Sequence, residues 1–363
     1  MFKVYIDYDK MHEICLEQDV EDVWYKILCK QQSININHSV DDDEFYDDEN
    51  NPLFLFSKMN GVQFKDETVY MDSVSTDNSN VLQQPCAAFI INIDQAKAIE
   101  IQNSFGVLCQ SIGKMNAKVL TIGDVTITTT TQGTWTKRLP FGKVLPSNSL
   151  ILVDRYLFGS ENDETLQDSY DNVMDMMEAF MPKCFDAEYH MCIIFDMDHV
   201  QDRDIKNLLG SEKSKDFTEE ERSKAFAKIS TKLNKLKNEF VKKHNYPVIL
   251  EVLSCDRRDK QSYEKTHDRR VISNYFYATA SHKLKAFRNE TPIQKQKIDL
   301  LTLYAKGIGG DLSDIPEYAH ADDIKDLQYV MQESKNHPTL HLYSINGNVN
   351  SSIKNAKNRI LVQ

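Results

Sequence analysis

The pattern that most restricts the fold is a long amphipathic helix flanked by two apolar segments. Apolar side chains recur at intervals of three and four residues: Phe226, Ile229, Leu233, Leu236 and Phe240. Thr218 and Glu221 precede them with the spacing of a capping box, which predicts where this helix begins. The flanking runs YHMCIIFDMD (189–198) and YPVILEVLS (246–254) predict strands. A helix between two buried strands is a crossover unit, and such units join parallel strands of a largely buried sheet.

The same alternation of strands and helices extends to both sides of this unit. An apolar strand is predicted in SLILVDRYLF (149–158), and a helix with apolar spacing follows at 166–181. After the unit, RRVISNYFYATA (269–280) predicts a fourth strand. The second half of the chain is therefore predicted to be an α/β domain in which a mixed sheet is flanked by helices.

The end of the chain is predicted to complete this domain. Residues 321–336 predict a helix, because Asp322 and Asp323 lie in its first turn, where they favour the helix dipole. Asn346-Gly347 is typical of a tight turn in a terminal hairpin.

The first half predicts a separate α/β or α+β domain, with a boundary near residue 145. Because 363 residues exceed the usual size of one hydrophobic core, two domains are expected, at 1–145 and 146–363. Within the first domain, strands, helices and two polar loops alternate. The predicted strands are FKVYID (2–7), CAAFIINID (86–94) and those in 118–135, the predicted helices are 20–32 and 95–113, and the predicted loops are the acidic block 41–51 and the polar stretch 72–85.

The overall composition excludes several classes of protein. The formal charge of −12 repels phosphate backbones, so contact with nucleic acid requires a local basic surface. No apolar run reaches the length of about 18 residues that a membrane span requires, and no membrane insertion is expected. The seven cysteines lack metal-ligand spacing. Since the first residues do not resemble a secretion signal, a cytoplasmic location is expected.

One short segment, YEKTHDRRVISNYF (263–276), carries the candidate site. Alternate residues of a strand point to the same side and lie about 6.6 Å apart, so His267 and Arg269 could converge on one phosphate. Histidine can attack phosphorus, and arginine can hold two phosphate oxygens. Asn274 lies at an odd offset from His267, so it joins them only if a bulge or turn intervenes. The alternative interpretation is a charged turn leading into a buried strand.

Residues 267–274, HDRRVISN, resemble a variant of the H-x-K-x-x-x-x-D/N motif of the phospholipase D superfamily. The order of elements over residues 148–335 also resembles divergent phospholipase D-like domains, such as the carboxy-terminal domain of MIT-domain proteins. In those domains a strand ending in Asp plus an aromatic residue precedes a later His-Asp-Arg. The resemblance implies that His267, Arg269 and Asn274 are catalytic, and that Asp154, Tyr156 and Asp268 support them.

The loop before the motif is weakly basic and is predicted to bind phosphate. Its candidate ligands are Arg257, Arg258, Lys265 and Arg270. The motif departs from the family pattern in two ways, because arginine replaces lysine and the chain has one motif where an active site needs two. The resemblance therefore implies either a homodimer that pairs two copies of His267 or a site that does not catalyse.

Two functions remain open at this point. The first is a phosphodiesterase or nuclease that needs no metal or cofactor and acts on nucleic acid or another phosphodiester. Single-motif relatives also occur in prokaryotic defence systems, so antiviral defence is an implied setting. The second is a noncatalytic module that keeps the fold and binds a protein or nucleic-acid partner in a larger complex.

Overall fold

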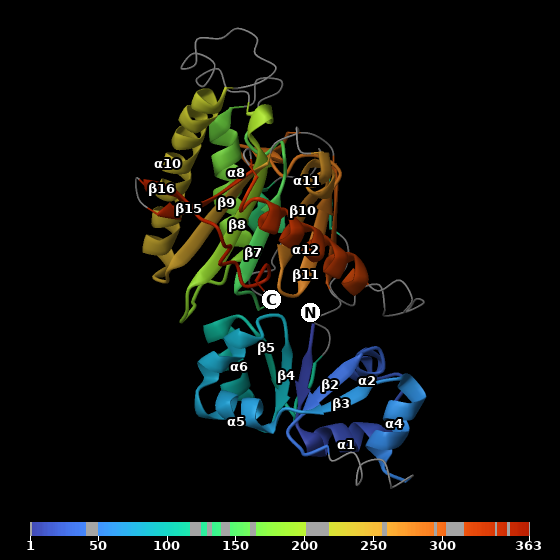
Figure 1. The fold of residues 1–363 in the computed structure, drawn as a ribbon. Helices are drawn as coiled ribbons and strands as arrows, with labels where there is room; N and C mark the ends of the chain where they lie inside the picture. Colours follow the sequence, from blue (N-terminus) through green and yellow to red (C-terminus); the bar gives the residue numbers. More distant parts are fainter. Residues whose placement is uncertain are drawn as a thin grey trace.

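The structure of the chain is a computed structural model, and it shows a mixed α/β protein built on two large sheets (Figure 1). The residues that it describes are 2–40, 50–116, 125–128, 133–138, 146–159, 165–200, 218–255, 260–293, 296–302, 316–337, 340–346 and 349–362. The predicted acidic loop lies largely outside them, at 41–49.

The first sheet is entirely parallel, and its strands lie in the order β3-β2-β1-β4-β5. The strands are β1 (Val4–Ile6), β2 (Ser33–Ile36), β3 (Gln63–Asp66), β4 (Ala88–Ile91) and β5 (Leu108–Ser111). The helices are α1 (Tyr8–Glu17), α2 (Val23–Leu28), α4 (Pro52–Asn60), α5 (Thr68–Thr76), the 3-10 turn η1 (Asn78–Gln83) and α6 (Gln95–Phe105). This is a doubly wound order, whose direction of winding reverses between β1 and β4.

Alternate side chains of β1 face two different helical layers. Val4 and Ile6 belong to the apolar cluster that contains Met11 of α1. Tyr5 faces the other way and stacks on Phe89 at 4.9 Å between ring centroids, in the cluster shared with α5 and α6. The sheet therefore has helices on both faces, as the period of two along a strand requires.

Two predictions for this region are wrong in detail. The polar stretch 72–85 is not a loop, because it forms the end of α5 and the turn η1, which the Asp77 carboxylate caps by accepting from the Ser79 backbone N–H. The helix predicted over 95–113 ends at Phe105, since Gly106 takes φ 61° and terminates it in the left-handed region. The rest of that segment is β5.

The second sheet has nine strands in the order β16-β15-β9-β8-β7-β10-β11-β14-β6. Its strands are β6 (Val125–Ile127), β7 (Ser149–Val153), β8 (Tyr189–Asp196), β9 (Val248–Cys255), β10 (Arg269–Ser273), β11 (Phe276–Ala280), β14 (Gln296–Thr302), β15 (His341–Asn346) and β16 (Val349–Ser352). The helices are α7 (Trp135–Arg138), α8 (Leu166–Phe180), η4 (Met197–His199), α10 (Glu219–His244), α11 (Lys260–Lys265) and α12 (Pro316–Glu333), and a small hairpin joins β12 (Phe287–Arg288) to β13 (Thr291–Pro292). Strands β7, β8 and β9 are parallel, and the other pairs are antiparallel.

Helices cover both faces of this sheet as well (Figure 1). Leu150 and Leu152 of β7 belong to the cluster that contains apolar residues of α8 and α10. Ile151 and Val153 point to the opposite face, in the cluster that contains Ile324 of α12. The crossover units predicted from the sequence are therefore confirmed, and so is the terminal hairpin, formed by β15 and β16.

The strand predicted over 269–280 is in fact two strands. β10 and β11 pair with each other in register, with Ile272 opposite Tyr277, so the chain reverses at Asn274 and Tyr275. This reversal lets β10 bond to β7 while β11 bonds to β14. The reversal thus adds one strand to the sheet, and both β10 and β11 have two neighbours.

The two sheets divide earlier in the chain than the predicted domain boundary. β6 pairs with β14 of the second sheet. Trp135 of α7 packs edge-on against Phe287, and its indole N–H donates to Asn172 of α8 at 3.2 Å. The chain passes from the first sheet to the second between β5 and β6, and independent folding of 1–145 and 146–363 stays a prediction.

Helix α10 begins as the sequence predicts, at a reciprocal capping box. The Thr218 hydroxyl accepts from the Glu221 backbone N–H, and the Glu221 carboxylate accepts from the Thr218 backbone N–H at 2.7 Å. We expect Thr218→Ala to lower the free energy of unfolding by about 1 kcal/mol, and Thr218→Ser to restore most of it. Urea denaturation measures both variants, and equal stability of the alanine and serine variants would contradict the capping role.

The two sheets meet through the amino-terminal ends of their parallel strands. Asn148, just before β7, donates to the carbonyl oxygens of Pro85 and Gly106, which precede β4 and β5. A Cβ atom added at Gly106 would lie 2.2 Å from the Ser147 carbonyl oxygen, so only glycine permits this approach. The carboxyl ends of the two sets of strands therefore point away from each other (Figure 1).

The described part of the chain contains no helix that is long and apolar enough to cross a membrane.

Candidate functional site

The candidate site lies at the edge of the second sheet where β7, β8 and β9 end. These strands are parallel, so their carboxyl ends meet at one edge. β10 runs antiparallel to β7, with Arg270 opposite Val153, so the beginning of β10 lies at the same edge. Arg269 is thereby brought beside Asp154 and Tyr156, which follow β7, and His267 lies two residues before it, ahead of the start of β10.

The His267 side chain is exposed at this edge, at 57% of its full accessible surface. Its Nδ1 lies 3.3 Å from Asp268 Oδ1. When Nδ1 carries the proton, it donates to this carboxylate, and Nε2 keeps its lone pair. Hydrogen bonding by His267 and Arg270 lowers the pKa of Asp268, although partial burial acts in the opposite direction. Asp268 therefore stays ionised as the acceptor for the ring.

The Arg269 guanidinium packs over the ring of Tyr156, 5.2 Å from its centroid. Its Nε is buried and has no hydrogen-bond partner among the described residues. A guanidinium stacked on an aromatic ring can still donate in its own plane. That Arg269 and His267 hold one phosphate together stays a prediction.

Asp154 is fully buried behind Arg269 and holds the loop that ends β7. Its carboxylate accepts from the backbone N–H groups of Tyr156 at 2.9 Å and Leu284 at 2.6 Å. Burial raises the pKa of Asp154 to about 6, against the effect of these hydrogen bonds and of nearby Arg269 and Lys283. Asp154 therefore ties the turn after β7 to the segment that contains Leu284, and its supporting role in the site stays a prediction.

The raised pKa of Asp154 makes the free energy of unfolding decrease as the pH rises. The folded state binds the Asp154 proton more tightly than the unfolded state, so the stabilisation is complete below pH 3.8 and is lost as the pH rises through about 6. We expect Asp154 alone to lower the free energy of unfolding by up to about 3 kcal/mol across this range. Urea denaturation of the wild type and Asp154→Asn at several pH values isolates this contribution. Identical pH profiles would contradict it.

Asn274 is not part of this site, which corrects the predicted triad. It lies beyond the other end of β10, roughly 23 Å along the strand from His267 at 3.3 Å per residue. Its side chain is fully buried, and Oδ1 accepts from the backbone N–H groups of Asn148 at 2.9 Å and Ser149 at 3.1 Å. Its Nδ2 donates to Pro85 O. Asn274 joins the two sheets and has no donor left for a phosphate.

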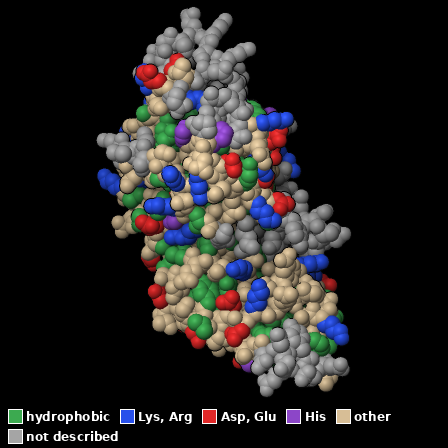
Figure 2. Space-filling model, viewed as in Figure 1, with side chains coloured by type: hydrophobic (Ala, Val, Ile, Leu, Met, Phe, Trp, Pro, Cys, Tyr) green, Lys and Arg blue, Asp and Glu red, His purple; other side chains and the backbone are tan. Residues whose placement is uncertain are grey.

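The predicted basic loop is largely neutralised where the structure describes it. Lys265 pairs with Asp326 of α12. Arg270 is buried and pairs with Asp268 at 3.2 Å and Asp323 at 3.1 Å. Arg257 and Arg258 lie outside the described residues. Figure 2 shows the same mixing of charge, with basic and acidic side chains interspersed over this face of the molecule.

The edge also contains residues that the sequence reasoning missed. His199 Nε2 lies 3.6 Å from the carboxylate of buried Asp196 at the end of β8, and its ring lies 4.3 Å from that of Tyr156. Arg155 lies between the two predicted residues Asp154 and Tyr156 and is buried beneath Tyr263 of α11. The available signal was a charged residue directly after a buried parallel strand, in VDRY and in FDMD.

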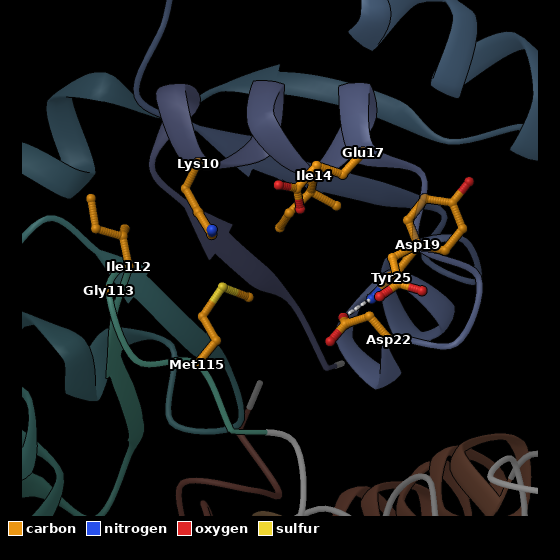
Figure 3. A pocket seen from close by; sticks show the side chains of 9 residues that line it. All are labelled: Lys10, Ile14, Glu17, Asp19, Asp22, Tyr25, Ile112, Gly113 and Met115. Atoms are coloured by element: carbon orange, nitrogen blue, oxygen red, sulfur yellow. Dashed lines mark hydrogen bonds between the residues drawn. The ribbon is translucent and has the colours of Figure 1, made fainter.

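A cavity of about 210 Å³ lies elsewhere, in the first half of the chain (Figure 3). It is bordered by α1, α2 and the segment after β5, and Lys10, Ile14 and Met115 are among its lining residues. Lys10 pairs with Glu13, and the Asp22 carboxylate on its rim accepts from the Tyr25 backbone N–H. These charges are used within the fold, so the cavity has less ligand-binding chemistry than the edge of the second sheet.

Among the described residues, no group of three or more His, Cys, Asp or Glu side chains is arranged to hold a metal ion. Comparisons with models of known protein families, with curated proteins and with solved structures found no match for this chain.

Proposed function

We propose that the edge formed by His267 and Arg269 binds phosphodiesters, and that the second half of the chain is a phospholipase D-like domain. The observation that carries this proposal is the exposed imidazole with Nδ1 on Asp268, two residues before an arginine whose buried Nε has no hydrogen-bond partner among the described residues. One group offers a nucleophilic nitrogen and the other offers a cation for the phosphate oxygens.

Cleavage in this proposal requires two copies of the chain. Nε2 of His267 attacks phosphorus, the bond from phosphorus to the leaving oxygen breaks, and the imidazolium of His267 of the partner subunit gives that oxygen its proton. Water then attacks phosphorus, the bond from phosphorus to Nε2 breaks and restores the neutral imidazole, and the partner subunit's His267 takes up the proton of that water. Charge on the phosphate oxygens is offset by Arg269 throughout. Because each chain supplies one motif, a symmetric dimer completes the pair.

The test measures binding and cleavage separately. Fluorescent single-stranded oligonucleotides and bis(p-nitrophenyl) phosphate are incubated with the full chain in EDTA, and the molecular mass in solution is determined alongside. We expect binding that weakens with salt, and turnover that appears only at concentrations where the dimer forms. A protein that neither binds nor cleaves any of these probes would refute the proposal.

A noncatalytic interaction module is the second candidate, and one observation favours it. Both described residues of the predicted phosphate-binding set, Lys265 and Arg270, are held in ion pairs with acidic residues of the same domain. These ion pairs reduce the positive charge that is available to stabilise a transition state, so the site suits binding of a partner better than catalysis. In that case oligonucleotides bind and stay intact at every concentration, and Arg269→Ala weakens binding while His267→Ala does not.

A further inference from the structure

Arg155 is a buried cation whose hydrogen-bonding capacity is unused. Its side chain is 1% exposed, and Nε, Nη1 and Nη2 all lack hydrogen-bond partners among the residues that the structure describes. A buried guanidinium usually has an acidic or carbonyl partner, because the loss of hydration is otherwise uncompensated. Burial accordingly lowers the pKa of Arg155.

The neighbours of Arg155 cover its side chain but do not accept hydrogen bonds from its guanidinium among the described residues. The guanidinium carbon lies 3.3 Å from the ring centroid of Tyr263, so the ring stacks on one face of the plane and leaves the N–H groups at its rim. Asp196 lies in the next strand, where its backbone N–H donates to the Arg155 carbonyl at 3.3 Å. The Asp196 carboxylate contacts His199, and its negative charge raises the pKa of Arg155 against the larger effect of burial without donating or accepting a hydrogen bond at the guanidinium.

Arg155 and Arg269 leave the same edge on opposite faces of the sheet. Ile151 and Val153 face the layer of α12, and Arg155 continues this alternation beneath α11, which packs on α12. Val271 faces the layer of α8 and α10, and Arg269 continues that alternation over Tyr156. The two cations therefore flank the edge, and Asp154 directly precedes Arg155 in the chain.

We propose that Arg155 is a second phosphate ligand of this edge, and that the ligand is a single-stranded oligonucleotide with successive phosphates on Arg269 and Arg155. This inference rests on the proposed function and adds a substrate class to it. A ligand with one phosphate reaches only Arg269, because the sheet edge separates the two guanidinium groups. Tyr263 covers Arg155 in the ligand-free protein, so binding of the second phosphate displaces α11 from the guanidinium.

The first experiment compares Arg155→Met with Arg269→Met in the full chain. The probes are a thymidine dinucleotide, which has one internal phosphodiester, and a longer oligothymidylate. We expect Arg155→Met to weaken binding of the longer probe by roughly tenfold and that of the dinucleotide by less than about twofold. Arg269→Met is expected to weaken both. The same Arg155→Met substitution should raise the melting temperature of the ligand-free protein, since it replaces a buried guanidinium that lacks hydrogen bonds by an apolar side chain of similar volume.

The outcomes separate this inference from the proposed function. If the wild type binds neither probe, the proposed function fails. If binding depends on Arg269 and is unaffected by Arg155→Met, only the second ligand is refuted. A lower melting temperature with unchanged affinity would show that Arg155 is structural and would refute the second ligand.

A second variant covers the case in which Arg155→Met does not fold. Tyr263→Ala removes the cover and leaves the guanidinium in place. We expect it to strengthen binding of the longer oligothymidylate by roughly threefold or more, because α11 no longer has to be displaced, and to leave the dinucleotide unaffected. Unchanged or weaker binding of the longer probe would overturn the inference.

Discussion

Replacement of His267 by alanine is expected to lower phosphodiester cleavage by a factor on the order of a thousand or more, because the reaction loses its nucleophile. The free energy of unfolding should change by less than about 0.5 kcal/mol, since the side chain is 57% exposed and its contact is with exposed Asp268. Initial rates in EDTA and urea denaturation measure the two quantities. His12→Ala is the matched control, because His12 lies on α1 in the other half of the molecule.

Mixing the His267→Ala variant with the wild-type protein tests whether two chains share one active site. If each dimer needs both histidines, random exchange of equal amounts leaves about one quarter of the dimers active. If each chain works alone, about half of the sites remain active. Wild-type turnover in the His267→Ala protein itself would rule out the phosphohistidine route.

Replacement of Asn274 by alanine is expected to produce the largest loss of stability, about 3 to 5 kcal/mol. The substitution leaves the buried N–H groups of Asn148 and Ser149 and the carbonyl of Pro85 without the amide that joins them. Urea denaturation measures the loss, and Asn103→Ala, at an exposed position of α6, is the control. If Asn274→Ala weakened oligonucleotide binding in the folded protein without loss of stability, the residue would belong to the site after all.

The elements that the sequence predicts well are those that local periodicity determines. The 3-4 spacing from Phe226 to Phe240 and the capping box at Thr218 define α10 without reference to the rest of the chain. The reversal at Asn274 and Tyr275 could not be predicted in this way. It has no glycine or proline signal, and it depends on β7 and β14 as partners for β10 and β11.

The candidate site also combines features that local sequence determines with features that depend on distant residues. The sequence locates Arg269 at the start of β10, whereas His267, predicted on the same strand, lies before it. The role of Asn274 depends on Pro85, which lies 189 positions away in the chain, so no local pattern indicates it. Arg155 was passed over because the motif comparison singled out the residues on either side of it.

The junction between the two sheets gives the molecule two poles. A ligand at Arg269 and a ligand at the switch between β1 and β4 would occupy opposite extremities, so they could be held at the same time without collision. The hydrogen bonds of Asn148 and Asn274 hold the two sheets together at this junction. A change of structure at one end of the molecule could therefore reach the other end through these buried amides.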